Sequence, residues 1–143
     1  MPHLVILYNS SLDRHVDMSA LCRQLADTML AQRDEFDQPL FPPGGTRVFA
    51  YPAPHFAIGD GGIAGRVANG IGEYNFAYLN LRMGRGRSEA VQQRVGQDLK
   101  ATARAHFEPL LATYYVGVTL QIDVGAEVFD AKLSNIHPLF NRG

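Results

Sequence analysis

Proline is the second residue of the chain, and the pattern of a buried strand follows it at once. Pro2 precedes an apolar run from His3 to Tyr8. Removal of the initiator methionine, which is usual before a small residue, would leave the proline nitrogen as a free secondary amine. Burial at a strand start disfavours the charged form of an amine and lowers its pKa from the usual value of about 8. Pro2 is therefore a candidate general base, although chance alone places proline at about 5% of positions.

Three arginines lie close together where a strand pattern ends and a helix pattern begins. They are Arg82, Arg85 and Arg87, and Ser88 follows them as a helix cap. Free N–H groups at a helix start favour an anion, and a guanidinium can bind a carboxylate through two hydrogen bonds. The segment therefore predicts an anion site, with a solvated turn as the alternative. No Gly-Lys-Ser/Thr follows, so the segment is not a Walker loop.

The remaining candidate groups lack the spacing of a metal, nucleotide or hydrolase site. The five histidines show no metal-ligand spacing, and Cys22 is the only cysteine, so neither a metal site nor an intramolecular disulfide is predicted. Gly59 to Ala64 matches G-x-G-x-x-A, but further glycines follow where a helix should begin, which favours a glycine loop. There is also no G-x-S-x-G motif.

Composition limits the class of protein. A chain of 143 residues with 46% hydrophobic residues fits a single domain over 1–143. The net charge of −1, from 13 basic and 14 acidic residues, argues against nucleic acid or an anionic membrane as a partner. No apolar run approaches the roughly 20 residues of a membrane span, and no secretory signal pattern is present. We therefore expect a cytoplasmic protein.

Hydrophobic periodicity predicts four strands and two helices that position these groups. The expected strands are 3–8, 46–51, 74–82 and 116–124, and the expected helices run from Asp17 to about Gln32 and from Ser88 to about Leu111. In the last strand the inward residues are expected to be Val116, Val118, Leu120, Ile122 and Val124.

Proline and glycine predict where these elements stop or bend. Pro52 and Pro54 are expected to close the second strand, and Pro109 to kink the second helix near its end. The segment 56–72 is predicted to be a surface loop with one short helical turn at about 63–67. The tail from 129 to 143 is predicted to be a C-terminal arm.

The order of the elements predicts an α/β (α+β) fold. Two consecutive β-α-β units would form a four-stranded sheet with two helices on one face. The strands at 3–8 and 74–82 are apolar on both alternating faces, so the second face must also be covered. A partner subunit is the expected cover.

With a candidate amine and a candidate anion site in place, the chain resembles the 5-carboxymethyl-2-hydroxymuconate isomerase family of the tautomerase superfamily over most of its length. The resemblance is carried by Met1-Pro2-His3, by YNFAYLNLRMGRGRS at 74–88 and by NIHPLF at 135–140. The Gly-Arg-Ser turn that ends the second segment is its most specific internal part.

The resemblance implies a homotrimer in which Pro2 is the catalytic base and arginines hold the carboxylates of a small substrate, without a cofactor. Arg87 matches the substrate-binding arginine of the turn. A second family arginine falls at Gly45, so Arg47 matches only the neighbouring arginine and is the candidate to replace it.

The activity implied is that of an enol–keto isomerase, or tautomerase, acting on a carboxylated 2-hydroxydienoate such as 5-carboxymethyl-2-hydroxymuconate in aromatic catabolism. One alternative is another proline-based reaction on an unsaturated acid, namely hydration, dehalogenation or decarboxylation. The other is a non-catalytic trimer that binds a small anion, which retention of Met1 would favour because the nitrogen of Pro2 would then be an amide.

Overall fold

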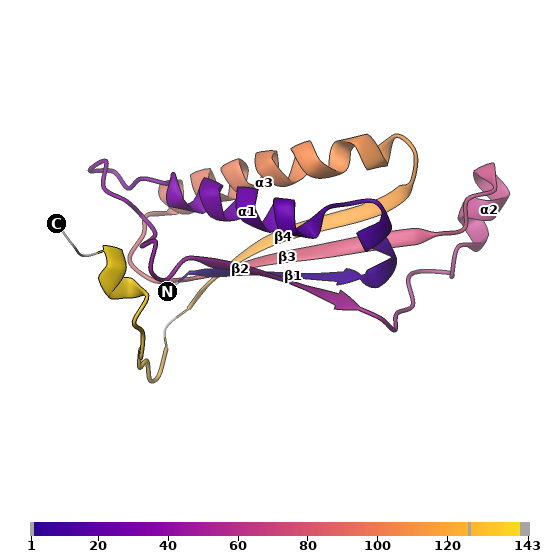
Figure 1. Ribbon diagram of the computed structural model, residues 1–143. Helices are drawn as coiled ribbons and strands as arrows, with labels where there is room; N and C mark the ends of the chain where they lie inside the picture. The colour runs from indigo at the N-terminus through magenta and orange to yellow at the C-terminus, as the bar shows by residue number, and fades with distance from the viewer. Residues whose placement is uncertain (1, 126, 141–143) are drawn as a thin grey trace.

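Four strands form one sheet in the order β2-β1-β3-β4 in the computed structural model, which describes residues 2–125 and 127–140 (Figure 1). The pairs β1–β2 and β3–β4 are parallel, whereas β1 and β3 are antiparallel at the centre. The strands are β1 His3–Asn9, β2 Arg47–Ala53, β3 Tyr74–Gly84 and β4 Tyr115–Gly125. This arrangement confirms the two predicted β-α-β units.

Two long helices cover one face of the sheet, as predicted (Figure 1). Both begin at the predicted caps: the carboxylate of Asp17 accepts a hydrogen bond from the amide of Ala20 at 3.0 Å, and Ser88 Oγ accepts from the amide of Val91 at 3.2 Å. The helices are α1 Met18–Leu30, α2 Ile63–Asn69 and α3 Glu89–Leu111, with 3₁₀ turns η1 Ser10–Arg14 and η2 His137–Phe140.

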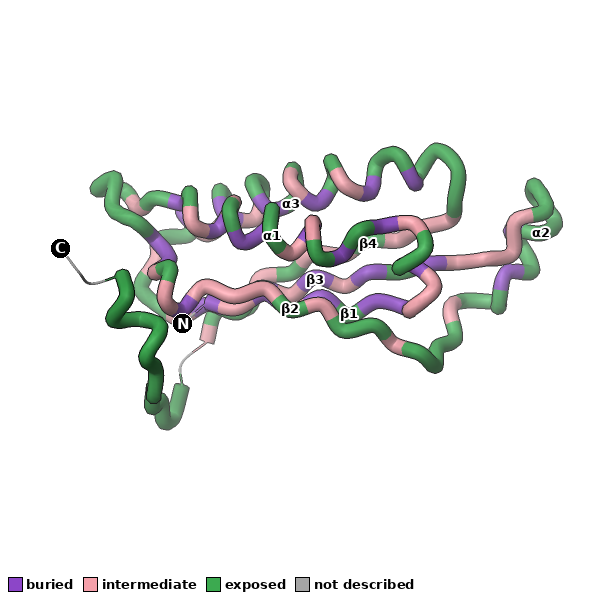
Figure 2. Tube along the Cα trace, in the orientation of Figure 1, coloured by how far each residue is buried: buried purple, intermediate pink, exposed green. Residues whose placement is uncertain are grey.

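The hydrophobic core lies between the sheet and the two long helices (Figure 2). Alternate residues of the central strands point into it, and the most deeply buried include Leu4, Ile6, Leu79 and Leu81. The opposite sheet face, called here the open face, leaves Leu7, Phe49, Tyr51 and Phe76 between 43% and 52% exposed. The sequence predicted burial on both faces, and a single chain buries only the helix side.

The second strand ends immediately before Pro54, one of the two prolines predicted to close it, but it passes Pro52. β2 continues through Pro52 to Ala53, because an edge strand leaves one side of its backbone unpaired and a missing N–H is tolerated there. α3 ends at Leu111, as predicted, with Pro109 inside its last turn.

The predicted loop at 56–72 contains a seven-residue helix, α2, which projects beyond the end of the sheet (Figure 1). The carboxylate of Asp60 explains why this helix forms despite its glycines. It accepts hydrogen bonds from the amides of Gly62, Ile63 and Ala64 at 2.9 to 3.1 Å and so satisfies the donors of the first turn.

The inward pattern predicted for β4 is only partly correct. Val116, Leu120 and Ile122 pack against the core, but Val118 and Val124 are 36% and 39% exposed. β4 is an edge strand, and α3 alone covers it. Within the described residues, no helix is both long enough and apolar enough to cross a bilayer.

Candidate active site

The start of β1 lies at the end of the sheet where β2 also begins and β3 ends. His3, the first residue of β1, pairs with Arg47 on β2 and with Arg82 on β3. Pro2 immediately precedes His3 and is buried. The topology therefore places the candidate base beside arginines from both neighbouring strands.

Arg87 approaches this end of the sheet from the helix side. Its Nη1 donates to the carbonyl of Gly84 and its Nη2 to the carbonyl of Leu40, both at 3.2 Å. The guanidinium carbon lies 5.6 Å from the centre of the Phe41 ring, a distance at which a cation is attracted to the ring face. A guanidinium has five N–H donors, so three remain after these two bonds.

Arg47 approaches from the open face. Val48 and Ala50 pack against the core, so the alternating residue Arg47 points the other way. Its Nη1 donates to the carbonyl of Gly45 at 2.7 Å, and its Nη2 lies 3.4 Å from Nδ1 of His3. The two predicted substrate arginines thus lie at the same end of the sheet but on different faces.

The three arginines of the predicted anion site lie apart in the structure. Arg82 belongs to β3 and points to the open face, because its neighbours Leu81 and Met83 are buried in the core. Arg85 is exposed in the turn, and Arg87 lies on the helix side. Arginines that are close in sequence therefore lie on two different sides of the sheet, the open face and the helix side.

Burial and positive charge act together on His3. Burial is the main cause that lowers the pKa of the His3 imidazole below its usual 6.5, and the charges of Arg47 and then Arg82 lower it further. At neutral pH the ring is uncharged, and its Nδ1 can accept the hydrogen bond from Arg47.

A pocket of about 360 Å³ opens on this side of the sheet. Basic residues of β2, β1 and β3 line its floor, and Glu127 together with residues 130–134 of the C-terminal arm lines its wall. The arm is seated close by, since a Cβ added to Gly44 would lie 2.5 Å from the Cα of His137 in η2. The pocket is large enough for a small carboxylated molecule, and its described lining includes Arg47 but neither Pro2 nor Arg87.

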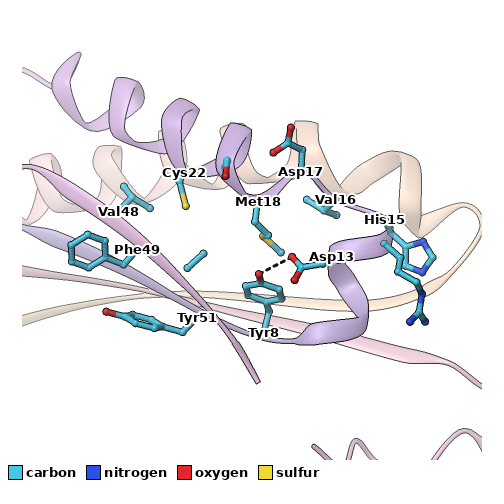
Figure 3. A pocket seen from close by; sticks show the side chains of 13 residues that line it. Tyr8, Asp13, His15, Val16, Asp17, Met18, Cys22, Val48, Phe49 and Tyr51 are labelled. Atoms are coloured by element: carbon cyan, nitrogen blue, oxygen red, sulfur yellow. Dashed lines mark hydrogen bonds between the residues drawn. The ribbon is translucent and has the colours of Figure 1, made fainter. Parts of the chain in front are cut away.

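A larger pocket, of about 1020 Å³, lies elsewhere, between α1 and β2 (Figure 3). The hydroxyl of Tyr8 donates to Asp13 Oδ1 there at 2.7 Å, and burial followed by this bond raises the pKa of Tyr8 to about 12. Burial also raises the pKa of the Cys22 thiol, so the sulfur is protonated and weakly nucleophilic at neutral pH. The pocket contains none of Pro2, Arg47 and Arg87.

Across residues 2–125 and 127–140, no group of three or more metal-ligating side chains gathers in one place.

Comparison with known proteins decides the family. The model of the 5-carboxymethyl-2-hydroxymuconate isomerase family matches residues 2–140. The chain belongs to this family. It is accordingly an isomerase of the 5-carboxymethyl-2-hydroxymuconate isomerase family, which confirms the resemblance predicted from the sequence.

Individual relatives agree with the family assignment. A crystal structure of a 5-carboxymethyl-2-hydroxymuconate delta-isomerase is 64% identical, with a TM-score of 0.95 over 100% of this chain and 95% of that one. The 5-carboxymethyl-2-hydroxymuconate Delta-isomerase of Escherichia coli is 22% identical over 140 residues, 98% of this chain and 99% of its own.

More distant proteins share this fold. A fused 4-OT described as an asymmetric trimer has a TM-score of 0.53 at 15% identity, over 96% of this chain and 98% of that one. This similarity confirms the predicted tautomerase-like fold.

Sequence reasoning proposed Pro2, Arg47 and Arg87 as site residues, but it missed the position of His3 and the direction of the Arg82 side chain. Strand alternation could have placed Arg82 opposite Leu81 and Met83. The pairing of His3 with both arginines depends on strand order and register, which local patterns do not specify.

Proposed function

We propose that this isomerase converts the enol form of a carboxylated 2-hydroxydienoate, such as 5-carboxymethyl-2-hydroxymuconate, into the conjugated ketone in aromatic catabolism. The amine of Pro2 is the general base. The observation that supports this proposal is the burial of Pro2 at the sheet end, next to the strand positions of Arg47 and Arg82 and beside the turn that carries Arg87.

The reaction moves one proton and shifts two double bonds. The neutral amine accepts the proton of the 2-hydroxyl group, the C–O bond becomes a carbonyl, and the adjacent double bond moves along the carbon chain. The protonated amine then returns a proton to a carbon distant from the new carbonyl. Atoms and electrons balance without a cofactor or a co-reactant.

The surroundings of Pro2 favour a neutral amine once Met1 has been removed. Burial disfavours the charged form, and nearby guanidinium groups disfavour it further, so both effects lower the pKa of the amine from its usual value of about 8. A base with a pKa near the working pH is the most effective proton shuttle.

The arginines hold the substrate in this scheme. Arg87 binds one carboxylate through its remaining N–H donors. Arg47 binds the substrate from the open face. Positive charge near the substrate oxygen stabilises the negative charge that develops there in the transition state, which is where such stabilisation increases the rate.

We propose further that the enzyme works as a cytoplasmic homotrimer. The exposed apolar side chains of the open face support this assembly, because a soluble monomer rarely leaves a contiguous apolar surface uncovered. The arm adds exposed apolar residues, among them Phe129 and Leu133 at 84% and 102% exposed.

Replacing the base tests the proposal. The Pro2→Ala variant should fold as the wild type does but lower kcat by at least about 100-fold, the typical contribution of an acid–base group. Turnover is followed by the absorbance of the dienol, and mass spectrometry must show that both proteins have lost Met1.

Two outcomes would contradict the proposal. Retained turnover in Pro2→Ala would show that Pro2 is not the base. A wild-type chain that keeps Met1 would have an amide at Pro2 and no amine to act. If the dienol is inert but another unsaturated acid is hydrated, dehalogenated or decarboxylated, the proline is the base of a different reaction.

A further inference from the structure

His3 lies between two arginines at the start of β1. It is paired with Arg47 on β2 and with Arg82 on β3. Because Leu4 is buried in the core, strand alternation turns His3 to the open face, which Arg47 and Arg82 also occupy. All three side chains line the 360 Å³ pocket. The imidazole is therefore part of the pocket, although the proposed reaction gives it no role.

The contact between His3 and Arg47 determines which imidazole nitrogen carries the proton. Nη2 of Arg47 lies 3.4 Å from Nδ1 of His3. A guanidinium has N–H donors and no acceptor, and it stays protonated in proteins, so Arg47 must be the donor. Nδ1 is then the unprotonated nitrogen, and the ring proton is on Nε2. This hydrogen bond exists only while the imidazole is neutral.

Arg47 is held at both of its terminal nitrogens. Nη1 donates to the carbonyl of Gly45 at 2.7 Å, and Nη2 donates to His3. Among the residues that the structure describes, Arg47 forms no ion pair, so no carboxylate orients its guanidinium. A backbone carbonyl does not titrate, whereas an imidazole does. His3 is therefore the partner through which pH can change the position of Arg47.

The charges around His3 favour the neutral imidazole. Positive groups on adjacent strands repel one another, and a protonated His3 would stand between two guanidinium groups. Burial, then Arg47 and then Arg82 lower the pKa of His3 below its usual 6.5. The arm brings both signs of charge to the pocket, and its charged residues there are Glu127, Asp130 and Lys132. Asp130 is paired with Lys132, which leaves the two arginines as the dominant charges beside the ring.

We propose that His3 is a positioning residue of this isomerase: its neutral imidazole holds the guanidinium of Arg47 at the pocket, and protonation of the ring releases it. The inference rests on the proposed function, in which Arg47 binds the substrate from the open face. Protonation replaces the acceptor lone pair of Nδ1 with an N–H group and adds a third positive charge beside the two arginines. Substrate binding through Arg47 should then weaken, while the proton transfer at Pro2 keeps its geometry.

Variants of residue 3 separate the Nδ1 acceptor from the rest of the ring. His3→Leu has no acceptor and should raise KM for the dienol about 5- to 10-fold at about pH 7.5, the value of one hydrogen bond, with kcat within about twofold. His3→Asn should recover most of this loss, because its amide oxygen lies close to the position of Nδ1 and accepts a hydrogen bond. His3→Gln, whose amide reaches the position of Nε2, should not recover it.

A double-mutant cycle shows whether His3 acts through Arg47. In an Arg47→Gln background, His3→Leu should leave KM nearly unchanged, because the group that His3 positions is already absent. Nitrogen NMR of the arginine guanidinium groups gives a readout that does not depend on turnover. Rotation about the Nε–Cζ bond of Arg47 should be slower in the wild type and in His3→Asn than in His3→Leu.

The pH dependence gives the sign of the effect. Protonation of Pro2 and of the substrate is common to all variants, so the ratio of kcat/KM between the wild type and His3→Asn isolates residue 3. This ratio should fall as the pH drops below about 6.5, by about 5- to 10-fold in all, since only the wild type loses its acceptor. His55→Gln, at an exposed histidine, is the control and should keep the wild-type profile.

The inference is overturned if His3→Leu keeps the wild-type KM, or if its effect persists in full without Arg47. A ratio that rises in acid would also overturn it, because a charged His3 would then attract the substrate itself. An unchanged KM in Arg47→Gln alone would remove the role of Arg47, and the inference with it.

Failure of the proposed base is seen separately, as turnover retained by Pro2→Ala. A thermal melt establishes that each variant is folded, and His3→Gln replaces His3→Leu if the latter does not fold.

Discussion

The guanidinium of Arg87 is held in place by other groups of the protein. Two carbonyl groups and the Phe41 ring fix its guanidinium, and its own carbonyl accepts a hydrogen bond from Gln92 Nε2 at 3.1 Å. Such preorganisation means that little side-chain entropy is lost when a carboxylate binds.

Removal of the Arg87 charge should therefore lower the catalytic efficiency strongly. Arg87→Gln is expected to lower kcat/KM about 100-fold, comparable with the loss of one preorganised donor to a developing negative charge. Arg85→Gln is the matched control, two residues away and exposed, and should keep kcat/KM within about threefold. Steady-state kinetics on the dienol make the comparison. If both variants lowered kcat/KM equally, the loss would come from the lower positive charge of the protein and not from the position of Arg87.

At this scale the sequence predicted the groups but not their directions. Pro2 and Arg87 follow from a strand start and a strand-to-helix turn, which are local features. Arg82 can lie near Arg87 or near His3. Which of the two it lies near depends on the face of β3 that it occupies and on the strands that lie beside β1. Those facts come from long-range pairing, so the sequence did not reveal that the three arginines lie on different faces of the sheet.

Among the elements, α2 depends on one side chain for its start. The carboxylate of Asp60 accepts backbone hydrogen bonds, that of Ala64 contributing most, and these hold the pKa of Asp60 below its usual value. A lowered folded pKa means that the charged form stabilises α2 above the unfolded pKa, and that this stabilisation is lost as the pH falls through the folded pKa.

NMR can follow this dependence directly. Between pH 6 and pH 2, the amide shift of Ala64 should titrate with a midpoint below the ordinary aspartate value of about 4. Asp60→Asn should abolish that titration while leaving the amide of Ala20, capped by Asp17, unaffected. A midpoint at or above 4 for Ala64 would show that the capping bonds are not made in solution.

The elements that the sequence predicted best are those with a strong repeating pattern. α1 and α3 have apolar residues on one face and clear caps at Asp17 and Ser88, so their starts were correct. The length of α2 was underestimated because its glycines interrupt the helical pattern of apolar residues. Its capping residue, Asp60, also lies in a turn with glycines in the left-handed conformation, such as Gly61 and Gly62. β2 passes Pro52 because it lies at an edge, which strand order alone determines.

For the molecule as a whole, the open face should be buried between chains. Leu7 lies on it and is 50% exposed, whereas Leu111, on α3 in the helix layer, is 55% exposed. A charge placed in an apolar interface costs free energy because it loses hydration without gaining a partner. Leu7→Lys should therefore weaken the trimer, while Leu111→Lys should not.

Sedimentation equilibrium measures the difference. The wild type and Leu111→Lys should sediment at three times the 15.7 kDa chain mass, and Leu7→Lys should raise the dissociation constant at least about 30-fold, equivalent to about 2 kcal/mol. A trimer that tolerates Leu7→Lys would place the contact on another surface.

The two β-α-β units of one chain run in opposite directions, since β1 and β3 are antiparallel. β1 follows Pro2 at the chain start, but β3 follows Glu73 through an ordinary peptide bond at the far end of the sheet. The second unit therefore repeats the architecture without a counterpart of the candidate base Pro2. An electrophile that reacts with the terminal nitrogen should therefore label each polypeptide once, although each polypeptide contains two β-α-β units.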